Sequence, residues 1–400
     1  MQKKIIVLAI AGAISSIAAG SAFAADASVA PSVSFYGLLD YGFVNQGGNS
    51  GAVNTSPTSS FNSGISEGSR IGVKGGKDLA SGYKFIYELE YGITIDNNGQ
   101  GSNSPNVPTM TTGTNNTVSS NTNQSSPFWN RHSYVGVTGE AGTFVGGRVE
   151  GARYSFQNKY DPFAGGTVGN FGSLLGHQAR ADNAVAYISP TVAGGFSVLV
   201  AYTNRLGGDE LATENGDARL YAIAPQYNNG PLSITYDFED AFVHGTGDNI
   251  AINVLGASYD ASVVKLFGYW ESVKTTGALL ALNAPSLNVN QTAYMVGATV
   301  PAGSSATLKV SYGTVKDGFT SNNDCSKAAI GADYKADKNL TLYADFASIS
   351  NQTNASCTIT TSSSNYSGSK PGFEGVDSTF SGNANGQGTT GIDIGAKFTF

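Results

Sequence analysis

Residues 83–93 alternate between two kinds of side chain without interruption. Tyr, Phe, Leu and Ile occupy the odd positions, while Lys84, Ile86, Glu88 and Glu90 occupy even ones. A period of two predicts a β-strand with two unlike faces. A soluble sheet would bury the aromatic face in a core, whereas a membrane barrel would turn that face to lipid and line a water-filled lumen with the charged face.

Strand-like segments recur along the whole chain, and we predict about sixteen of them. Long polar stretches such as 45–64 alternate with tight turns such as 78–82, a pattern that is typical of outer-membrane barrels with long extracellular loops and short periplasmic turns. The pattern therefore predicts an all-β fold, a transmembrane antiparallel barrel. The predicted strands span residues 33–44, 69–77, 83–93, 128–138, 143–149, 179–189, 196–203, 219–227, 232–238, 250–259, 263–271, 291–300, 306–315, 328–334 and 340–347, with a last one ending at 400.

Charged side chains indicate which face of each strand points to water. A Lys or Arg on the lipid face at mid-bilayer costs ~2–4 kcal/mol, so charged positions should face the lumen. In the second strand, Ile71 and Val73 alternate with Arg70 and Lys74 in agreement with this rule. In residues 263–271 both faces carry large apolar side chains, so the pattern leaves the phase of that strand open.

The N-terminus predicts export. Lys3 and Lys4 precede an apolar run over residues 5–14, and Ala22-Phe23-Ala24 forms an A-x-A cleavage site. The run is shorter than the ~20 apolar residues of a spanning helix. We therefore interpret residues 1–24 as a signal peptide, rather than an anchor, and residues 25–400 as a single barrel domain.

Composition narrows the function classes. Without residues 1–24 the chain keeps 20 basic and 29 acidic residues, a formal net charge of −9, which argues against nucleic-acid binding. Charged residues make up only 13% of the chain, against about 25% in soluble domains. No stretch after residue 24 reaches 18 consecutive apolar residues, so a helical membrane protein is excluded.

The chain has two cysteines, of which Cys325 lies in the seventh predicted long connection and Cys357 in the eighth, neighbours around the rim. Exported proteins fold in an oxidising compartment, so we predict a disulfide between them. The spacing alone does not show whether their backbones come close enough.

Several short motifs follow one another in the first half of the chain. They are Ser34-Phe35-Tyr36-Gly37-Leu38-Leu39-Asp40, Ser69-Arg70-Ile71-Gly72-Val73-Lys74-Gly75, Asp78-Leu79 with Gly82-Tyr83-Lys84, Arg131-His132-Ser133-Tyr134-Val135-Gly136-Val137, Gly147-Arg148, Asp161-Pro162-Phe163 and Arg180-Ala181-Asp182-Asn183-Ala184-Val185-Ala186-Tyr187. Together they resemble Gram-negative general diffusion porins, and among these the trimeric porins of β-proteobacteria. After Tyr187 only the strand pattern continues the resemblance.

The resemblance implies a sixteen-stranded barrel in the outer membrane, usually a homotrimer, surrounded by lipids that include lipopolysaccharide. It also implies that small hydrophilic solutes diffuse through the lumen and that no cofactor or metal takes part. The terminal Phe400 is similar to the C-terminal aromatic residue that the outer-membrane assembly machinery reads in this family. Leu38 departs from the family, since some porins carry a basic residue there.

The third long connection, residues 150–177, is the candidate constriction loop, because four glycines at 165, 166, 169 and 172 allow it to bend inward. The resemblance maps Arg70, Arg131 and Arg180 onto the basic wall that faces this loop in porins. Arg148 is a further basic candidate, although its parity with Phe144 would turn it outward in a regular strand. The acidic candidates are Glu150, Asp161 and Asp182.

Arg153 and Lys159 nearly balance the acidic residues of the loop. We therefore hypothesise a weak anion preference, because local charge outweighs net charge in a narrow opening. The alternative is that the arginines form ordinary wall ion pairs.

Three other functions compete with general diffusion. An enzyme is disfavoured, because His132, His177 and His244 have no partner at motif spacing and no zinc or phosphate-binding motif is present. A substrate-specific channel would need a continuous track of lumen aromatics, which we cannot trace. An adhesin remains possible, because residues 97–123 and 358–388 form long Gly-, Ser- and Asn-rich loops.

Overall fold

The computed structural model describes residues 31–96, 129–175, 179–206, 218–243, 249–276, 290–361 and 388–400. The predicted signal peptide, together with His177 and His244, lies outside these residues. Within the described ranges no helix is both long and apolar enough to cross a membrane.

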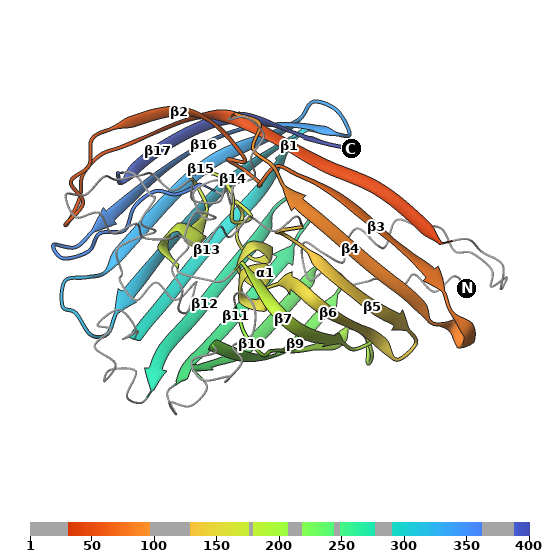
Figure 1. Cartoon of the computed structure of the whole chain (residues 1–400). Helices are drawn as coiled ribbons and strands as arrows, with labels where there is room; N and C mark the ends of the chain where they lie inside the picture. The colour runs from red at the N-terminus through yellow and green to blue at the C-terminus, as the bar shows by residue number, and fades with distance from the viewer. Residues whose placement is uncertain are drawn as a thin grey trace, which may run out of the picture.

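The strands form a single antiparallel sheet that closes into a barrel, as β1 pairs with β17 (Figure 1). Each long strand also pairs with its neighbours in sequence, and the two pieces β2 and β3 share one wall position, so the sheet of 17 strands has sixteen wall positions. This confirms the predicted fold class. The strands are β1 Ser32–Gly47, β2 Thr58–Ser63, β3 Arg70–Asp78, β4 Lys84–Gly92, β5 Ser133–Gly139, β6 Gly142–Glu150, β7 Arg180–Ile188, β8 Phe196–Thr203, β9 Ala218–Asn229, β10 Leu232–Val243, β11 Asn249–Asp260, β12 Lys265–Thr276, β13 Asn290–Ala302, β14 Ala306–Asp317, β15 Cys325–Lys335, β16 Leu340–Asn351 and β17 Thr390–Thr399; the helices are η1 Ala80–Gly82, α1 Ala152–Lys159 and η2 Phe171–Leu174.

The alternation in β4 has the predicted orientation. Ile86, Glu88 and Glu90 are buried on the lumen side, while Tyr87 and Leu89 on the other face are more accessible. Accessible apolar side chains recur on the outward faces of the other strands, as lipid contact requires. Local alternation therefore predicts the two faces of the wall correctly.

The structure also determines the phase of β12, which the sequence left open. Tyr269, Glu271 and Val273 are buried on the lumen side, whereas Leu266 is 51% exposed on the outward side. This strand also extends to Thr276, past the predicted end at residue 271, and β10 and β16 are likewise longer than predicted toward the long loops. At these strand ends polar residues do not stop the strand, because backbone pairing continues beyond the part of the barrel that carries apolar outward side chains.

The second wall position contains a feature that the sequence did not reveal. β1 pairs with β2 from Tyr41 to Gln46 and with β3 from Ser32 to Leu38. Residues 64–69 between β2 and β3 leave the sheet, with Ile65 fully buried. Asp40 stabilises this departure from the sheet, since its Oδ2 accepts hydrogen bonds from the backbone N–H groups of Ser66 and Glu67 at 2.7 and 2.6 Å. We call residues 64–69 the inward turn.

Candidate functional site

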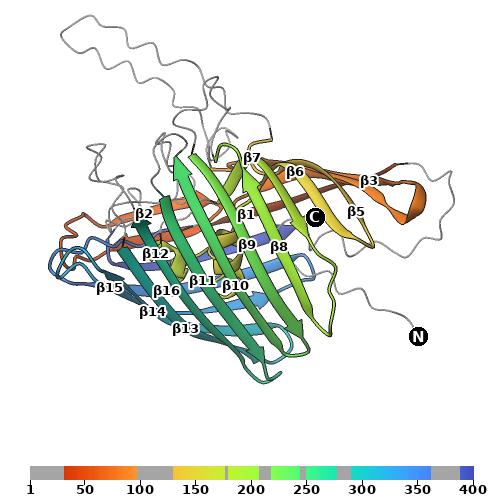
Figure 2. The ribbon, with the colours of Figure 1, turned by 90° about the horizontal axis from the view of Figure 1, so that it is seen from below.

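The connection between β6 and β7 lies inside the ring of strands. Both Figure 1 and Figure 2 draw the helical segments of this connection within the barrel. The helix α1 contacts β10 and β11, and η2 contacts β14 and β15. Tyr160, Phe163 and Phe171 of this connection are at most 4% exposed. A polar, glycine-rich loop with three buried aromatic rings packs against the wall instead of standing free in the lumen.

Glycines in the wall make room for this packing. A Cβ atom on Gly256 of β11 would lie 2.0 Å from the ring of Tyr160, and one on Gly313 of β14 would lie 2.3 Å from the ring of Phe171. Either contact is far inside van der Waals distance. β11 and β14 are therefore shaped to hold the loop against the wall.

A buried ion pair fixes the start of α1. Arg153 reaches Glu271 of β12 through Nη2–Oε1 at 2.5 Å and Nε–Oε2 at 2.8 Å, and its backbone N–H donates to Glu239 at 2.9 Å. Tyr269 also donates to Glu271 at 2.5 Å. Arg153 is thus directed into the wall, away from the lumen water, and anchors the loop.

Asp161, one of the predicted acidic pore residues, lies within the loop. It is 3% exposed and accepts hydrogen bonds from the backbone N–H groups of Phe163 and Phe171 at 2.9 and 2.7 Å. Burial raises the pKa of its carboxyl group, while these hydrogen bonds oppose the rise. Its carboxylate closes the turn of the loop and is not presented to passing solutes.

Glu150, the second acidic candidate, ends β6 and accepts a hydrogen bond from Ser155 Oγ of α1 at 2.8 Å. It lies opposite Arg180 in the ladder between β6 and β7. Arg180 is only 3% exposed, so it contributes charge to the wall more than direct contact with solutes.

Arg70 and Arg131 meet at one carboxylate. Arg70 Nε lies 3.2 Å from Glu90 Oε2, and Arg131 Nε lies 2.5 Å from Glu90 Oε1. Glu90 belongs to the alternating face of β4, which brings the arginines of β3 and of the segment before β5 together. Arg70 and Arg131, two of the predicted wall arginines, therefore share the Glu90 carboxylate.

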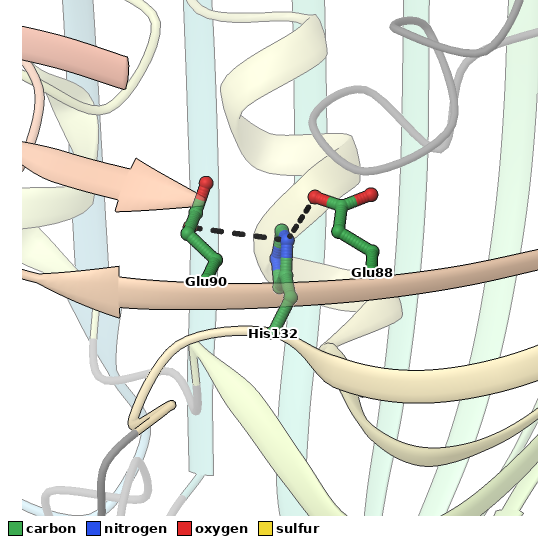
Figure 3. A group of neighbouring side chains, drawn as sticks. All are labelled: Glu88, Glu90 and His132. Atoms are coloured by element: carbon green, nitrogen blue, oxygen red, sulfur yellow. Dashed lines mark hydrogen bonds and ion pairs between the residues drawn. The ribbon is translucent and has the colours of Figure 1, made fainter. Parts of the chain in front are cut away.

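Figure 3 shows His132 between Glu88 and Glu90, with its Nδ1 3.1 Å from Glu88 and 3.9 Å from Glu90. Two carboxylates and an imidazole within reach of one another could hold a divalent cation. Each carboxylate oxygen, however, already faces a donor from a tyrosine or an arginine: Tyr36 and Tyr134 at Glu88, Arg70 and Arg131 at Glu90. We interpret the group as an ion-pair network that holds the arginines in place.

Arg148 lies at an irregularity of β6. The register with β7 shifts between Gly147 and Val149, and Gly147 has a φ of +135°, a conformation that favours glycine. Arg148 forms an ion pair with Asp182 and donates from Nε to the Asn130 carbonyl oxygen at 3.0 Å. The bulge thus removes the regular parity on which the outward orientation was predicted.

The sequence pattern did not identify Glu67 as a charged residue of this region. Glu67, on the inward turn, lies 3.0 Å from Arg70 and 2.5 Å from Lys397 of β17. The inward turn also touches the loop, because a Cβ on Gly166 would lie 1.9 Å from the Ser66 carbonyl oxygen. The sequence signal was the neighbouring Gly64 and Gly68, which interrupt the strand pattern, but glycines do not show where a chain bends.

Cys325 and Cys357 are bonded, with their Cα atoms 6.4 Å apart. At the opposite end of the barrel, Phe400 pairs with Gly37 of β1 through backbone hydrogen bonds of 3.0 and 3.1 Å. Its ring covers Gly37, where a Cβ would lie 2.3 Å from Cζ.

Comparisons with known proteins agree on one family. The family model of Gram-negative porins matches residues 8–354. An outer-membrane porin protein of Bordetella pertussis is 26% identical over 375 residues, 80% of this chain and 90% of that protein.

Two solved structures share the fold. The anion-selective porin from Comamonas acidovorans is similar with a TM-score of 0.68 and 21% identity, covering 93% of this chain and 100% of that one. The trimer form of OmpT from Vibrio cholerae is similar with a TM-score of 0.60 and 16% identity over 93% and 100% of the two chains. The chain therefore belongs to the Gram-negative porins, and it forms an outer-membrane channel for the passive diffusion of small hydrophilic solutes.

Proposed function

We propose that this porin is a general diffusion channel with a weak anion preference. In this proposal the preference arises at the candidate constriction loop, residues 150–177. The wall that faces this loop carries Arg70, Arg131, Arg148 and Arg180. The observation that carries the proposal is that three cationic side chains of this wall, Arg70, Arg148 and Lys397, stay accessible, whereas Glu88 and Glu90 are buried.

The total charge of the wall that faces the loop is balanced. Six basic residues lie there with six acidic ones, of which Asp393 accepts the backbone N–H of Val168 on the loop: Arg70, Lys74, Arg131, Arg148, Arg180 and Lys397 with Asp40, Glu67, Glu88, Glu90, Asp182 and Asp393. On the loop, Arg153 and Lys159 balance Glu150 and Asp161. The proposed anion preference therefore rests on which of these charges solutes can reach, and it is modest.

Accessibility supports the same sign. The side chains of Arg70, Arg148 and Lys397 keep 20, 26 and 23% of their surface accessible, so solutes can reach three cationic groups. Among the acidic partners, Glu67 and Asp182 are accessible, at 36 and 21%, whereas Glu88 and Glu90 are buried. The similarity to a porin whose description is anion-selective agrees with this proposal.

We also propose a homotrimer. An outward groove of about 520 Å³ runs along β1, β16 and β17, where Tyr41, Phe61, Leu342 and Ile394 surround small residues. Such a groove can receive side chains of a second copy in the membrane. OmpT, which has the same fold, has a trimer form.

The remaining partners belong to this proposal as well. Lipids, including lipopolysaccharide, would contact the accessible apolar side chains of the outer face, and the assembly machinery would read Phe400. We propose no enzymatic activity and no cofactor, because passive diffusion requires neither.

Reversal potentials across planar bilayers in a salt gradient test the selectivity. We expect large, nearly ohmic steps in groups of three and a permeability ratio modestly in favour of anions. A ratio in favour of cations would contradict the anion preference. Saturable block by a sugar would instead indicate a substrate-specific channel, and the absence of conductance would indicate an adhesin that uses its surface loops.

A further inference from the structure

The segment that carries Cys357 folds down against the lumen side of the barrel. Ala355, Cys357, Ile359, Thr360 and Thr361 are at most 1% exposed. The carbonyl oxygen of Ile359 accepts from Gln46 Nε2 of β1 at 3.0 Å, and its N–H donates to the Gly388 carbonyl oxygen at 3.0 Å. We call residues 355–361 the docked segment.

The docked segment contacts the constriction loop directly. Asn170 Nδ2 donates to the Thr360 carbonyl oxygen at 2.9 Å. Ile359 and Val168 both lie over Gly391 of β17, where a Cβ would be 2.8 Å from the Ile359 side chain and 3.0 Å from that of Val168. One polar and one apolar contact thus join two loops that lie far apart in the sequence.

Asn170 is also bound by a residue of β15, the strand that carries Cys325. Lys327 Nζ donates to the Asn170 carbonyl oxygen at 2.5 Å and lies 2.7 Å from Ser173 Oγ. Lys327 follows Cys325 by two residues on β15, so both side chains lie on the same face of that strand. Thr360 follows Cys357 by three residues.

These links close a ring of contacts. From Cys325 the ring runs along β15 to Lys327, then to Asn170, then to Thr360, and back through Cys357 to the disulfide. Without the disulfide, Lys327 and Thr360 would be joined only through the barrel wall and the hydrogen bonds of the docked segment, with no covalent link between β15 and that segment. With the disulfide in place, Lys327 and Thr360 stay close together, so each raises the effective concentration of the other near Asn170.

We propose that the Cys325–Cys357 disulfide is a positioning element of the pore, which locks the constriction loop at Asn170 by joining its two holders into one unit. This inference rests on the proposed role of the loop as the constriction. Cys325 and Cys357 are at most 2% exposed, so reductants have little access to the bond, and it acts as a permanent crosslink and not as a redox switch.

The first test measures amide hydrogen exchange of the folded full-length porin in detergent. In the double variant Cys325→Ser/Cys357→Ser, we expect exchange in residues 167–175 to rise about tenfold. Asn354→Ala is the matched control, because Asn354 lies on the same loop and, among the described residues, bonds Ser321 and Asn322 of the neighbouring loop and not Asn170. Unchanged exchange in residues 167–175 of the double variant would overturn the inference.

A second variant keeps the disulfide. Asn170→Ala breaks the ring on the loop side, and because coupling is reciprocal, exchange in residues 355–361 should rise. No rise there would also overturn the inference, even if the double cysteine variant fails to fold.

Bilayer recordings then separate this inference from the proposed function. We expect the double cysteine variant to spend about tenfold more time in closed or partly closed levels at a fixed voltage, while Asn354→Ala matches the wild type. If the wild type conducts and the variants gate normally, the positioning role is contradicted and the proposed function is not. A wild type that does not conduct contradicts the proposed function, while hydrogen exchange still decides the positioning role.

Discussion

Arg153 of α1 and Glu271 of β12 form a buried, two-point ion pair, with N–O distances of 2.5 and 2.8 Å. The residues are 118 positions apart in the sequence, and their side chains are 6 and 1% exposed. This pair connects the first turn of α1, in the connection between β6 and β7, to β12 of the wall. The position of the loop therefore depends on a charge pair that water does not screen.

Glu271→Gln should loosen the loop, because removal of one buried partner leaves the Arg153 charge uncompensated at a cost of about 3 kcal/mol. The barrel pairing does not involve this side chain, so we expect the heat resistance of the folded protein to fall only slightly. Current noise in single-channel recordings should increase. Glu140→Gln, on an exposed turn, is the control and should leave the noise unchanged; equal noise in both variants would contradict the anchoring role of Arg153.

Arg70→Gln should shift selectivity toward cations, because it removes an accessible positive charge and leaves Glu90 with one arginine fewer. We expect the anion-to-cation permeability ratio to fall roughly two- to fivefold. Lys84→Gln serves as the control, since Lys84 lies at the turn end of β4, far along the strand from Glu90. The same shift in both variants would mean that total charge, and not the wall cluster, sets selectivity.

The anion preference should depend on pH through Lys159. Burial, together with the charge of Lys265, lowers the pKa of Lys159 from 10.5 to about 8. Lys159 is therefore protonated below pH 8 and neutral above it, so a positive charge disappears from the loop as pH rises through 8. Reversal potentials from pH 6.5 to 9.5 should show the anion preference weakening, and Lys159→Gln should remove most of this dependence. A dependence that persists in the variant would assign it to another group.

Gly166→Ala should displace the loop from the inward turn, since the new methyl group would collide with the Ser66 carbonyl oxygen. Backbone atoms cannot swing aside, and such overpacking costs roughly 1–3 kcal/mol. We expect an altered single-channel conductance with a folded barrel. Gly268→Ala is the matched control, because no atom of the described residues lies within 4 Å of a Cβ at that position. If the two variants conduct alike, the contact does not shape the pore.

Deletion of Phe400 should reduce the yield of folded porin in the outer membrane several-fold. It removes the backbone pairing with Gly37 at the seam and the terminal aromatic ring. Phe400→Tyr keeps both features and should assemble normally. Cell fractionation with a heat-modifiability gel measures the yield, and normal assembly of the deletion variant would argue against a terminal signal.

The strands predicted from the sequence agree with those in the structure because alternation along a strand depends on neighbouring residues. A strand with a lipid face and a water face must alternate, so β4 and β17 can be placed from their own residues. β2 is the exception, because Thr58–Ser63 is short and polar and reads as part of a loop. The phase of β12 also required the structure, since lumen-facing Tyr269 is as apolar in character as the lipid-facing residues beside it.

The candidate site was predicted only in part. The sequence identified the wall arginines, but not that Arg70 and Arg131 share Glu90, nor that Glu67 approaches Arg70 from the inward turn. It selected Asp161 as a pore residue, whereas the structure places that carboxylate inside the loop. Charge type is visible in a sequence, but burial depends on which segments pack over the side chain.

By itself, the sequence determined the succession of strands and the two faces of the barrel, and it predicted an export signal and the side on which the long loops lie. These follow from periodicity and from the cost of charge in lipid, which act over a few residues. Only the tertiary structure decided how the lumen is filled: the inward turn, the Arg153–Glu271 anchor and the ring of contacts around Asn170. Each of these joins segments that are distant in the chain, and glycine-rich loops carry no periodic pattern that would show where they fold.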